Sequence, residues 1–169
     1  MLIQATKIIG LPVAAIDTQS KIGEVKKIVI DPENGSVLGM VVAPTGFFAK
    51  QKILSSQDII DFDKNGIVTK SDENLLDTHE VIRIEKILAS NIKIIGQKAI
   101  TSSKNRLGTI NDILIDLDTL AIVKYYISGL FQERILTSDK LVKITKDALI
   151  FSDDTIEQIP SGEIEGAAA

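Results

Sequence analysis

The chain contains no cysteine and no tryptophan, and His79 is its only histidine. The absence of cysteine excludes disulfides, thiolate metal ligands and a cysteine nucleophile. With a single histidine, neither a zinc site nor a histidine-based catalytic set is expected. Aromatic residues make up only 4 % of the chain, which leaves little for stacking on nucleic-acid bases. We therefore expect a protein that is not an enzyme and that has no catalytic residue, metal site or cofactor.

The sequence also lacks clustered positive charge and long apolar runs. Its 19 basic residues are interleaved with 23 acidic ones, for a net charge of −4, whereas a surface that binds nucleic acid needs clustered Lys and Arg. No apolar run approaches the ~18 residues of a transmembrane helix, and residues 1–7 have no signal-peptide pattern. We expect a soluble, cytoplasmic protein that does not bind nucleic acid directly.

The chain contains an internal sequence repeat. The sequence KIIG at residues 7–10 returns at 93–96, and IVID at 28–31 returns as ILID at 113–116. Two similar units of this size indicate a duplicated small domain rather than a solenoid, which has shorter periods and more repeats. Because each half is small for an independent hydrophobic core, we expect the halves to pack against each other.

Within each copy, short β-type segments alternate with turn signals. Residues 22–30 and 36–43 are rich in Ile and Val and flank Asp-Pro-Glu-Asn-Gly at 31–35, which predicts a hairpin. A further strand is expected over 47–54, followed by one capped helical turn at 55–58. Five or six short strands within residues 12–69 predict a small closed barrel.

A helix is expected between the copies, because Ile84, Ile87 and Leu88 have helical spacing with charged residues among them. The tail after residue 160 is small and polar, and is expected to be flexible. The expected organisation is described by four ranges: a first barrel domain at 1–77, a linking helix at 78–90, a second barrel domain at 91–160 and a flexible tail at 161–169.

The run KIIGLPVAAIDTQSKIGEVKKIVIDPENGSVLGMVV at residues 7–42, with KILSSQDI at 52–59, resembles the PRC-barrel family. That family includes the cytoplasmic barrel of the photosynthetic reaction-centre H subunit and the C-terminal domain of a ribosome-maturation factor. The second copy matches more weakly, because it lacks counterparts of Gly35 and Gly39. The resemblance implies a mainly β protein of two tandem small antiparallel β-barrels with a short linking helix. It implies an assembly or docking role only loosely, because one fold supports many functions.

Asp31 and Asp116 recur at the ends of equivalent strands. A carboxylate ligand or an acid/base role is one reading of this recurrence. We favour turn capping, in which the carboxylate accepts backbone N–H groups two residues on, because it requires no further partner residue.

Aromatic residues next to turns are the candidate partner contacts. Phe47 and Phe48 follow Pro-Thr-Gly where a strand is expected, so alternation should point one ring inward and one outward. An outward ring could anchor a partner, and packing against the second barrel is the alternative. Tyr125 and Phe131 raise the same question in the second copy.

The expected function is that of a non-catalytic adaptor that docks a protein partner through its loops and the surface between its barrels. The alternatives are an accessory factor in ribosome or rRNA maturation, and a peripheral accessory of a photosynthetic or other membrane complex. A homodimer, and a small-molecule site between the barrels, also stay open, because domain interfaces often contain pockets.

Overall fold

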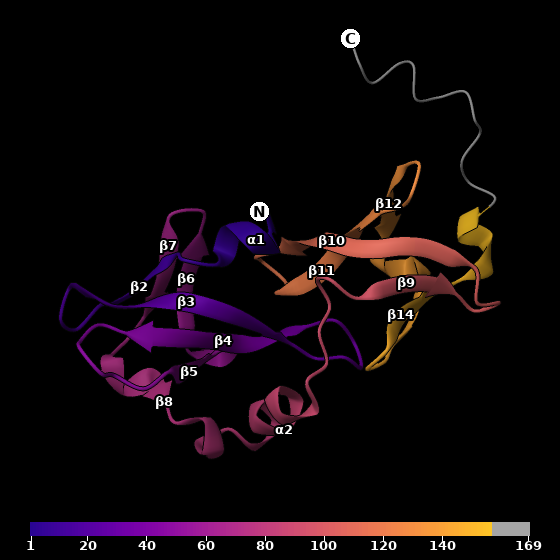
Figure 1. Cartoon of the computed structure of the whole chain (residues 1–169). Coiled ribbons are helices and arrows are strands. Elements are labelled where there is room, and N and C mark those ends of the chain that lie inside the picture. Colours follow the sequence, from indigo (N-terminus) through magenta and orange to yellow (C-terminus); the bar gives the residue numbers. More distant parts are fainter. Residues whose placement is uncertain (157–169) are drawn as a thin grey trace, which may run out of the picture.

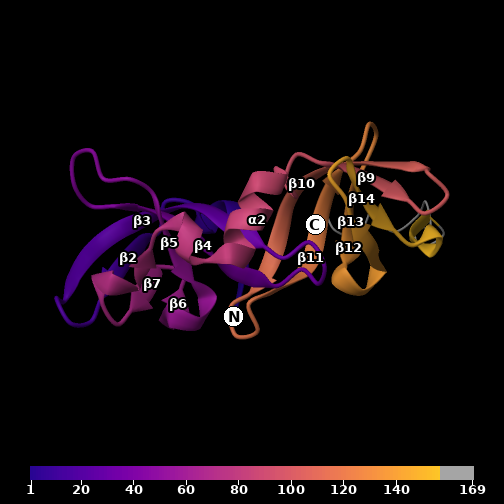
Figure 2. The same ribbon diagram turned by 90° about the horizontal axis from the view of Figure 1, so that it is seen from below.

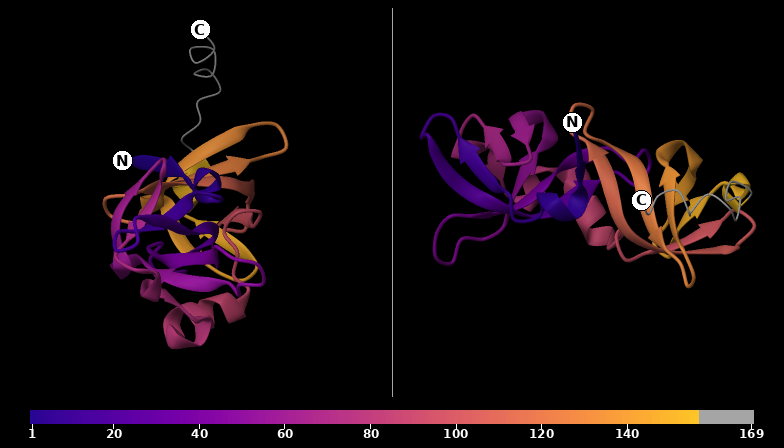
Figure 3. Two further views of the ribbon diagram at one scale, coloured as in Figure 1. Left: turned by 90° about the vertical axis from the view of Figure 1, so that its left-hand side faces the viewer. Right: turned by 90° about the horizontal axis from the view of Figure 1, so that it is seen from above.

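The computed structural model describes residues 1–156 and shows a mainly β protein with two curled sheets (Figures 1, 2 and 3). The expected flexible tail at 161–169 lies outside the described residues. Each sheet contains seven strands.

The first sheet has the order β6-β7-β2-β3-β4-β5-β8. Its strands are β2 (Pro12–Ala15), β3 (Ser20–Ile30), β4 (Val37–Pro44), β5 (Lys52–Ser55), β6 (Ile59–Asp63), β7 (Gly66–Thr69) and β8 (Leu75–Leu76). The long β3–β4 hairpin confirms the hairpin predicted over 22–43.

The second sheet has the order β13-β14-β9-β10-β11-β12, with β1 paired to β10. Its strands are β1 (Leu2–Gln4), β9 (Lys98–Thr101), β10 (Arg106–Asp116), β11 (Ala121–Ser128), β12 (Glu133–Thr137), β13 (Leu141–Ile144) and β14 (Ala148–Phe151). Six strands of each sheet therefore follow the same order, and the same pair of short strands, β2–β7 and β9–β14, is parallel in each.

The helical elements are short. Within residues 1–156 they are α1 (Ala5–Ile8), α2 (Ile82–Ser90) and five 3-10 segments, η1 (Ser56–Asp58), η2 (Asp72–Asn74), η3 (Thr78–Glu80), η4 (Ser138–Lys140) and η5 (Asp153–Ile156). The Ser55 hydroxyl accepts the N–H of Gln57 at the start of η1, which confirms the capped turn predicted there. Helix α2 follows the first sheet in the sequence, ends at Ser90 and is capped by Asn91, which has a left-handed conformation.

The repeated KIIG motif forms the same turn twice. Gly10 and Gly96 have φ values of +88° and +86°, a region that favours glycine. Their N–H groups donate to the carbonyl oxygens of Val25 (2.8 Å) and Ile110 (2.7 Å), which lie in the long strands β3 and β10. The sequence repeat is thus a repeat of backbone geometry.

Two further paired glycines allow close approach between strands. A Cβ on Gly23 would lie 2.7 Å from the carbonyl oxygen of Ala43, and one on Gly108 only 2.2 Å from that of Ser128. Real Cβ atoms do not come so close to backbone oxygens, so each long hairpin depends on glycine at this position.

The two halves share one hydrophobic core, as their small size predicted. It contains Ile8, Val25 and Met40 from the first half and Ile110 and Phe151 from the second, all at most 1 % exposed. A separate cluster forms where Ile84 of α2 packs on the opposite face of the first sheet, against Val29, Val41 and Ile53. Helix α2 therefore covers the face of β3, β4 and β5 that points away from the main core (Figure 1).

Backbone pairing also joins the halves. The N–H of Val37 donates to the carbonyl oxygen of Leu120 (2.7 Å), and that of Ile122 donates to Gly35 (3.1 Å), so the tips of the two long hairpins meet. Strand β1 crosses over to pair with β10. The range 1–77 expected for the first domain therefore includes a strand that belongs to the second sheet, because pairing across the junction is invisible in local sequence.

The strand predicted over 47–54 is wrong in its first part. β5 begins only at Lys52, and residues 45–51 form a loop after β4. Gly46 and Phe48 both have positive φ, +129° and +68°, which is incompatible with a continuous strand.

Candidate interaction surface

Each sheet carries an apolar loop at an equivalent place, after the second strand of its long hairpin. The β4–β5 loop spans 45–51 and the β11–β12 loop spans 129–132. Phe47 and Phe48 are 95 % and 97 % exposed in the first loop, and Leu130 and Phe131 are 88 % and 98 % exposed in the second. Neighbouring large apolar side chains that are exposed together form an apolar patch, and contiguous apolar patches mark interaction sites more often than single exposed residues do.

The β4–β5 loop holds both of its aromatic rings in solvent. The rings of Phe47 and Phe48 contact each other edge to face, with centroids 5.4 Å apart and planes at 68°. The prediction that one ring points inward is wrong, since strand alternation does not apply to a loop. Packing of these rings against the second half is also excluded by their exposure.

The β11–β12 loop is a tight turn closed by a hydrogen bond from the N–H of Gly129 to the carbonyl oxygen of Gln132, 2.9 Å long. Phe131 lies at its exposed tip, as a partner contact requires. Leu130 was missed by sequence reasoning, although a signal was present. The triplet Gly-Phe-Phe at 46–48 returns as Gly-Leu-Phe at 129–131.

The two loops lie on one side of the molecule when it is seen from below. In Figure 2 the purple β4–β5 loop and the orange tip beyond β11 and β12 lie on the same side of the ribbon, whereas in Figure 1 the orange tip rises from the top and the β4–β5 loop lies at the left edge. They lie far apart along the long axis, one on each sheet. We call these two loops, with Phe47, Phe48, Leu130 and Phe131, the apolar tips.

Tyr125 does not belong to this surface. It is 1 % exposed and its ring packs edge to face on Phe151, with centroids 5.3 Å apart. Burial raises the pKa of the Tyr125 hydroxyl. The expectation of Tyr125 as a partner contact is therefore wrong, because its position in β11 points into the core of the second sheet.

Asp31 and Asp116 cap turns, as predicted. An oxygen of Asp31 accepts the N–H of Glu33 (3.0 Å), and one of Asp116 accepts the N–H of Asp118 (3.1 Å). The bond from Asp118 is the main cause of a lowered pKa at Asp116. Local side-chain-to-backbone bonds of this kind explain the recurrence without any catalytic role.

Asp31 has a second partner that sequence reasoning missed. The guanidinium of Arg83 in α2 donates to the Asp31 carboxylate, which is only 2 % exposed, and lies 3.3 Å from Glu33. This ion pair ties α2 to the tip of the first long hairpin. Its partners are 52 residues apart in sequence, so no local pattern indicates it.

Residues 1–156 contain no group of three or more His, Cys, Asp or Glu side chains placed to hold a metal ion. His79 is exposed in η3. Within the same range, every helix is too short or too polar to cross a bilayer.

Comparison with known proteins adds one match. The family model for the PRC-barrel domain matches residues 1–76, which run from the N-terminus through β8 of the first sheet. A search of curated proteins found no match.

Proposed function

We propose that this chain, whose residues 1–76 are a PRC-barrel domain, is a non-catalytic adaptor made of two tandem barrels of that type joined by α2. The second barrel is supported by the equal order of six strands in the two sheets. It is also supported by the matched glycine turns at Gly10 and Gly96. The absence of cysteine from the sequence supports a reducing, cytoplasmic location.

The main observation in support of an adaptor function is the pair of apolar tips. Four large apolar side chains are at least 88 % exposed, two on each sheet. Burying one such side chain fully in a partner contributes about 1.5–3 kcal/mol. Aromatic anchors that enter pockets provide most of the affinity in many interfaces.

Two tips on one scaffold also favour binding at two points. Each tip is a small anchor of weak affinity, but simultaneous contact through a rigid scaffold makes the second contact intramolecular. The partner that fits is a protein with two separate apolar pockets, or two copies of one pocket in a symmetric assembly. A shared core and paired backbone between the sheets hold the spacing of the tips fixed.

The test is photo-crosslinking in living cells with p-benzoylphenylalanine placed at position 48 or 131. Position 57, an exposed glutamine in η1, is the matched control. We expect the same partner to be captured from positions 48 and 131 and not from 57. No adduct, or the same adduct from all three positions, would refute the proposal.

The identity of the adduct also separates the alternatives. A role in ribosome maturation predicts a ribosomal protein in the adduct and co-sedimentation with a ribosomal subunit. A peripheral role on a membrane complex predicts a membrane-bound subunit in the adduct. Neither outcome requires direct RNA binding, which the net charge of −4 disfavours.

A further inference from the structure

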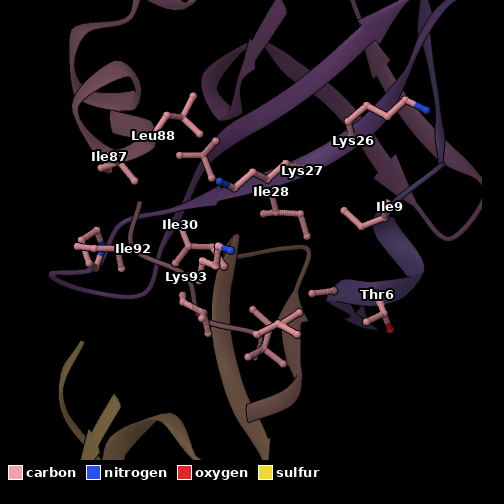
Figure 4. Close-up of a pocket in the computed structure, with 16 residues that line it drawn as sticks. Thr6, Ile9, Lys26, Lys27, Ile28, Ile30, Ile87, Leu88, Ile92 and Lys93 are labelled. Carbon is pink, nitrogen blue, oxygen red and sulfur yellow. The ribbon is translucent and has the colours of Figure 1, made fainter. Parts of the chain in front are cut away.

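A cavity of about 430 Å³ lies where α1, β3, α2 and the segment after α2 come together (Figure 4). Its walls are mainly aliphatic, with Ile9 after α1, Ile28 from β3, Leu88 from α2 and Ile94 from the following segment. This volume falls within the roughly 300–1,000 Å³ of small-molecule sites. None of the residues 45–51 or 129–132 lines it, so the cavity is separate from the apolar tips.

The cavity wall is only partly covered by the rest of the chain. Ile9 and Ile95 are the third residues of the two KIIG motifs, and they are 46 % and 39 % exposed. Several neighbouring isoleucines are half-buried. Displacement of water from an aliphatic cleft of this kind by an apolar ligand is favourable in free energy.

The charged groups at the cavity are all positive. Its lining residues include Lys26, Lys27 and Lys93 and no carboxylate. Lys26 pairs with Glu24 at 3.3 Å, but neither Lys27 nor Lys93 forms an ion pair within residues 1–156. In Figure 4 the ammonium groups of Lys27 and Lys93 reach toward the same region of the cavity, whereas Lys26 points away.

We infer that this cavity binds a long-chain carboxylate, with the alkyl chain against the isoleucines and the carboxylate between Lys27 and Lys93. Two like charges side by side repel each other, and an anion between them replaces repulsion by attraction. The alkyl chain matches walls whose side chains, apart from the lysines and Thr6, are apolar.

An acidic peptide is the nearest competitor and fits less well. Its backbone N–H and C=O groups would face aliphatic side chains without hydrogen-bond partners, which is costly. An alkyl chain carries no such groups. This inference does not depend on the proposed adaptor role, and the two can fail independently.

The first test is titration of the full chain with laurate, below its micelle concentration, by calorimetry and by NMR of isoleucine methyl groups. We expect one equivalent to bind, with shifts at Ile28 and Ile94 and none at the exposed Ile60 on β6. Dodecyltrimethylammonium, with the same chain length and opposite charge, should not bind. Equal binding of both amphiphiles, or shifts only at the apolar tips, would overturn the inference.

Substitutions in the cavity test where the carboxylate and the alkyl chain of laurate bind. The double variant Lys27→Gln/Lys93→Gln should bind laurate at least tenfold more weakly, whereas Lys124→Gln, an exposed lysine on β11, should bind as the natural chain does. Ile28→Trp should abolish binding by filling the cavity, and circular dichroism checks that it folds. Unchanged affinity in the double lysine variant, or binding of an acidic peptide or anionic vesicles but not of laurate, would also overturn the inference.

Discussion

Gly10, Gly23 and Gly108 differ in why glycine is needed: positive φ, close contact with a neighbouring strand, or both. Alanine at each position should therefore destabilise the fold to a different extent. Gly10 has a φ of +88° and no atom within 4 Å of the position of a Cβ. Gly10→Ala therefore carries only the cost of a left-handed conformation, about 1–2 kcal/mol.

Gly23 presents the opposite case. It has no strained φ, but an added Cβ would lie 2.6 Å from Cγ1 of Val42 and 2.7 Å from the oxygen of Ala43. Gly23→Ala therefore carries a steric cost, about 1–3 kcal/mol for overpacking. Gly108 combines both, with a φ of +144° and a contact of 2.2 Å to the oxygen of Ser128.

We expect Gly108→Ala to lower the free energy of unfolding by about 2–5 kcal/mol, more than either single constraint. The assay is urea denaturation of the three variants and the natural chain, followed by circular dichroism with the slope compared between variants. The reasoning is refuted if Gly108→Ala is no less stable than Gly10→Ala, since the contact between β10 and β11 would then be adjustable at no cost.

Three further predictions follow from exposure, ion pairing and turn capping. Phe48→Ser and Phe131→Ser should change the free energy of unfolding by no more than about 0.5 kcal/mol, because both rings are at least 97 % exposed, and a larger loss in thermal melting would show hidden packing. Arg83→Ala should cost about 1.5–3 kcal/mol in urea denaturation, because it removes a charged partner from the buried Asp31 carboxylate, and Arg83→Lys should recover part of it. The pKa of Asp116 is lowered on folding, so its contribution is present above the unfolded pKa of about 3.9 and is lost as pH falls through the folded value. The urea midpoint should therefore drop below about pH 4, less steeply in Asp116→Asn, and an equal drop in that variant would contradict this role.

Local patterns predicted much of the β structure. The hairpin around residues 31–35 was identifiable because Pro, Asn and Gly determine turn geometry within a few residues. The capping role of Asp31 and Asp116 was identifiable for the same reason, since each carboxylate bonds to the backbone two residues later. The resemblance of the first copy to the PRC-barrel family rested on these turn and glycine positions, and the family match over residues 1–76 confirms it.

The candidate surface was predicted less completely. Phe47, Phe48 and Phe131 were identified as candidates, and all three are exposed. Tyr125 was wrongly included, because it lies within β11 and its side chain points into the core. Leu130 was left out, although its triplet repeats that of the first copy.

The spacing of apolar residues and the positions of turn-forming residues can be identified from the sequence, because their effects extend over only a few neighbouring residues. The repeated KIIG turns and the long hairpins follow from residue types alone. The pairing of β1 with β10, the ion pair between Arg83 and Asp31, and the cavity with Lys27 and Lys93 join residues far apart in the chain. Such contacts depend on how the two sheets pack on one shared core, and only the tertiary structure decided them.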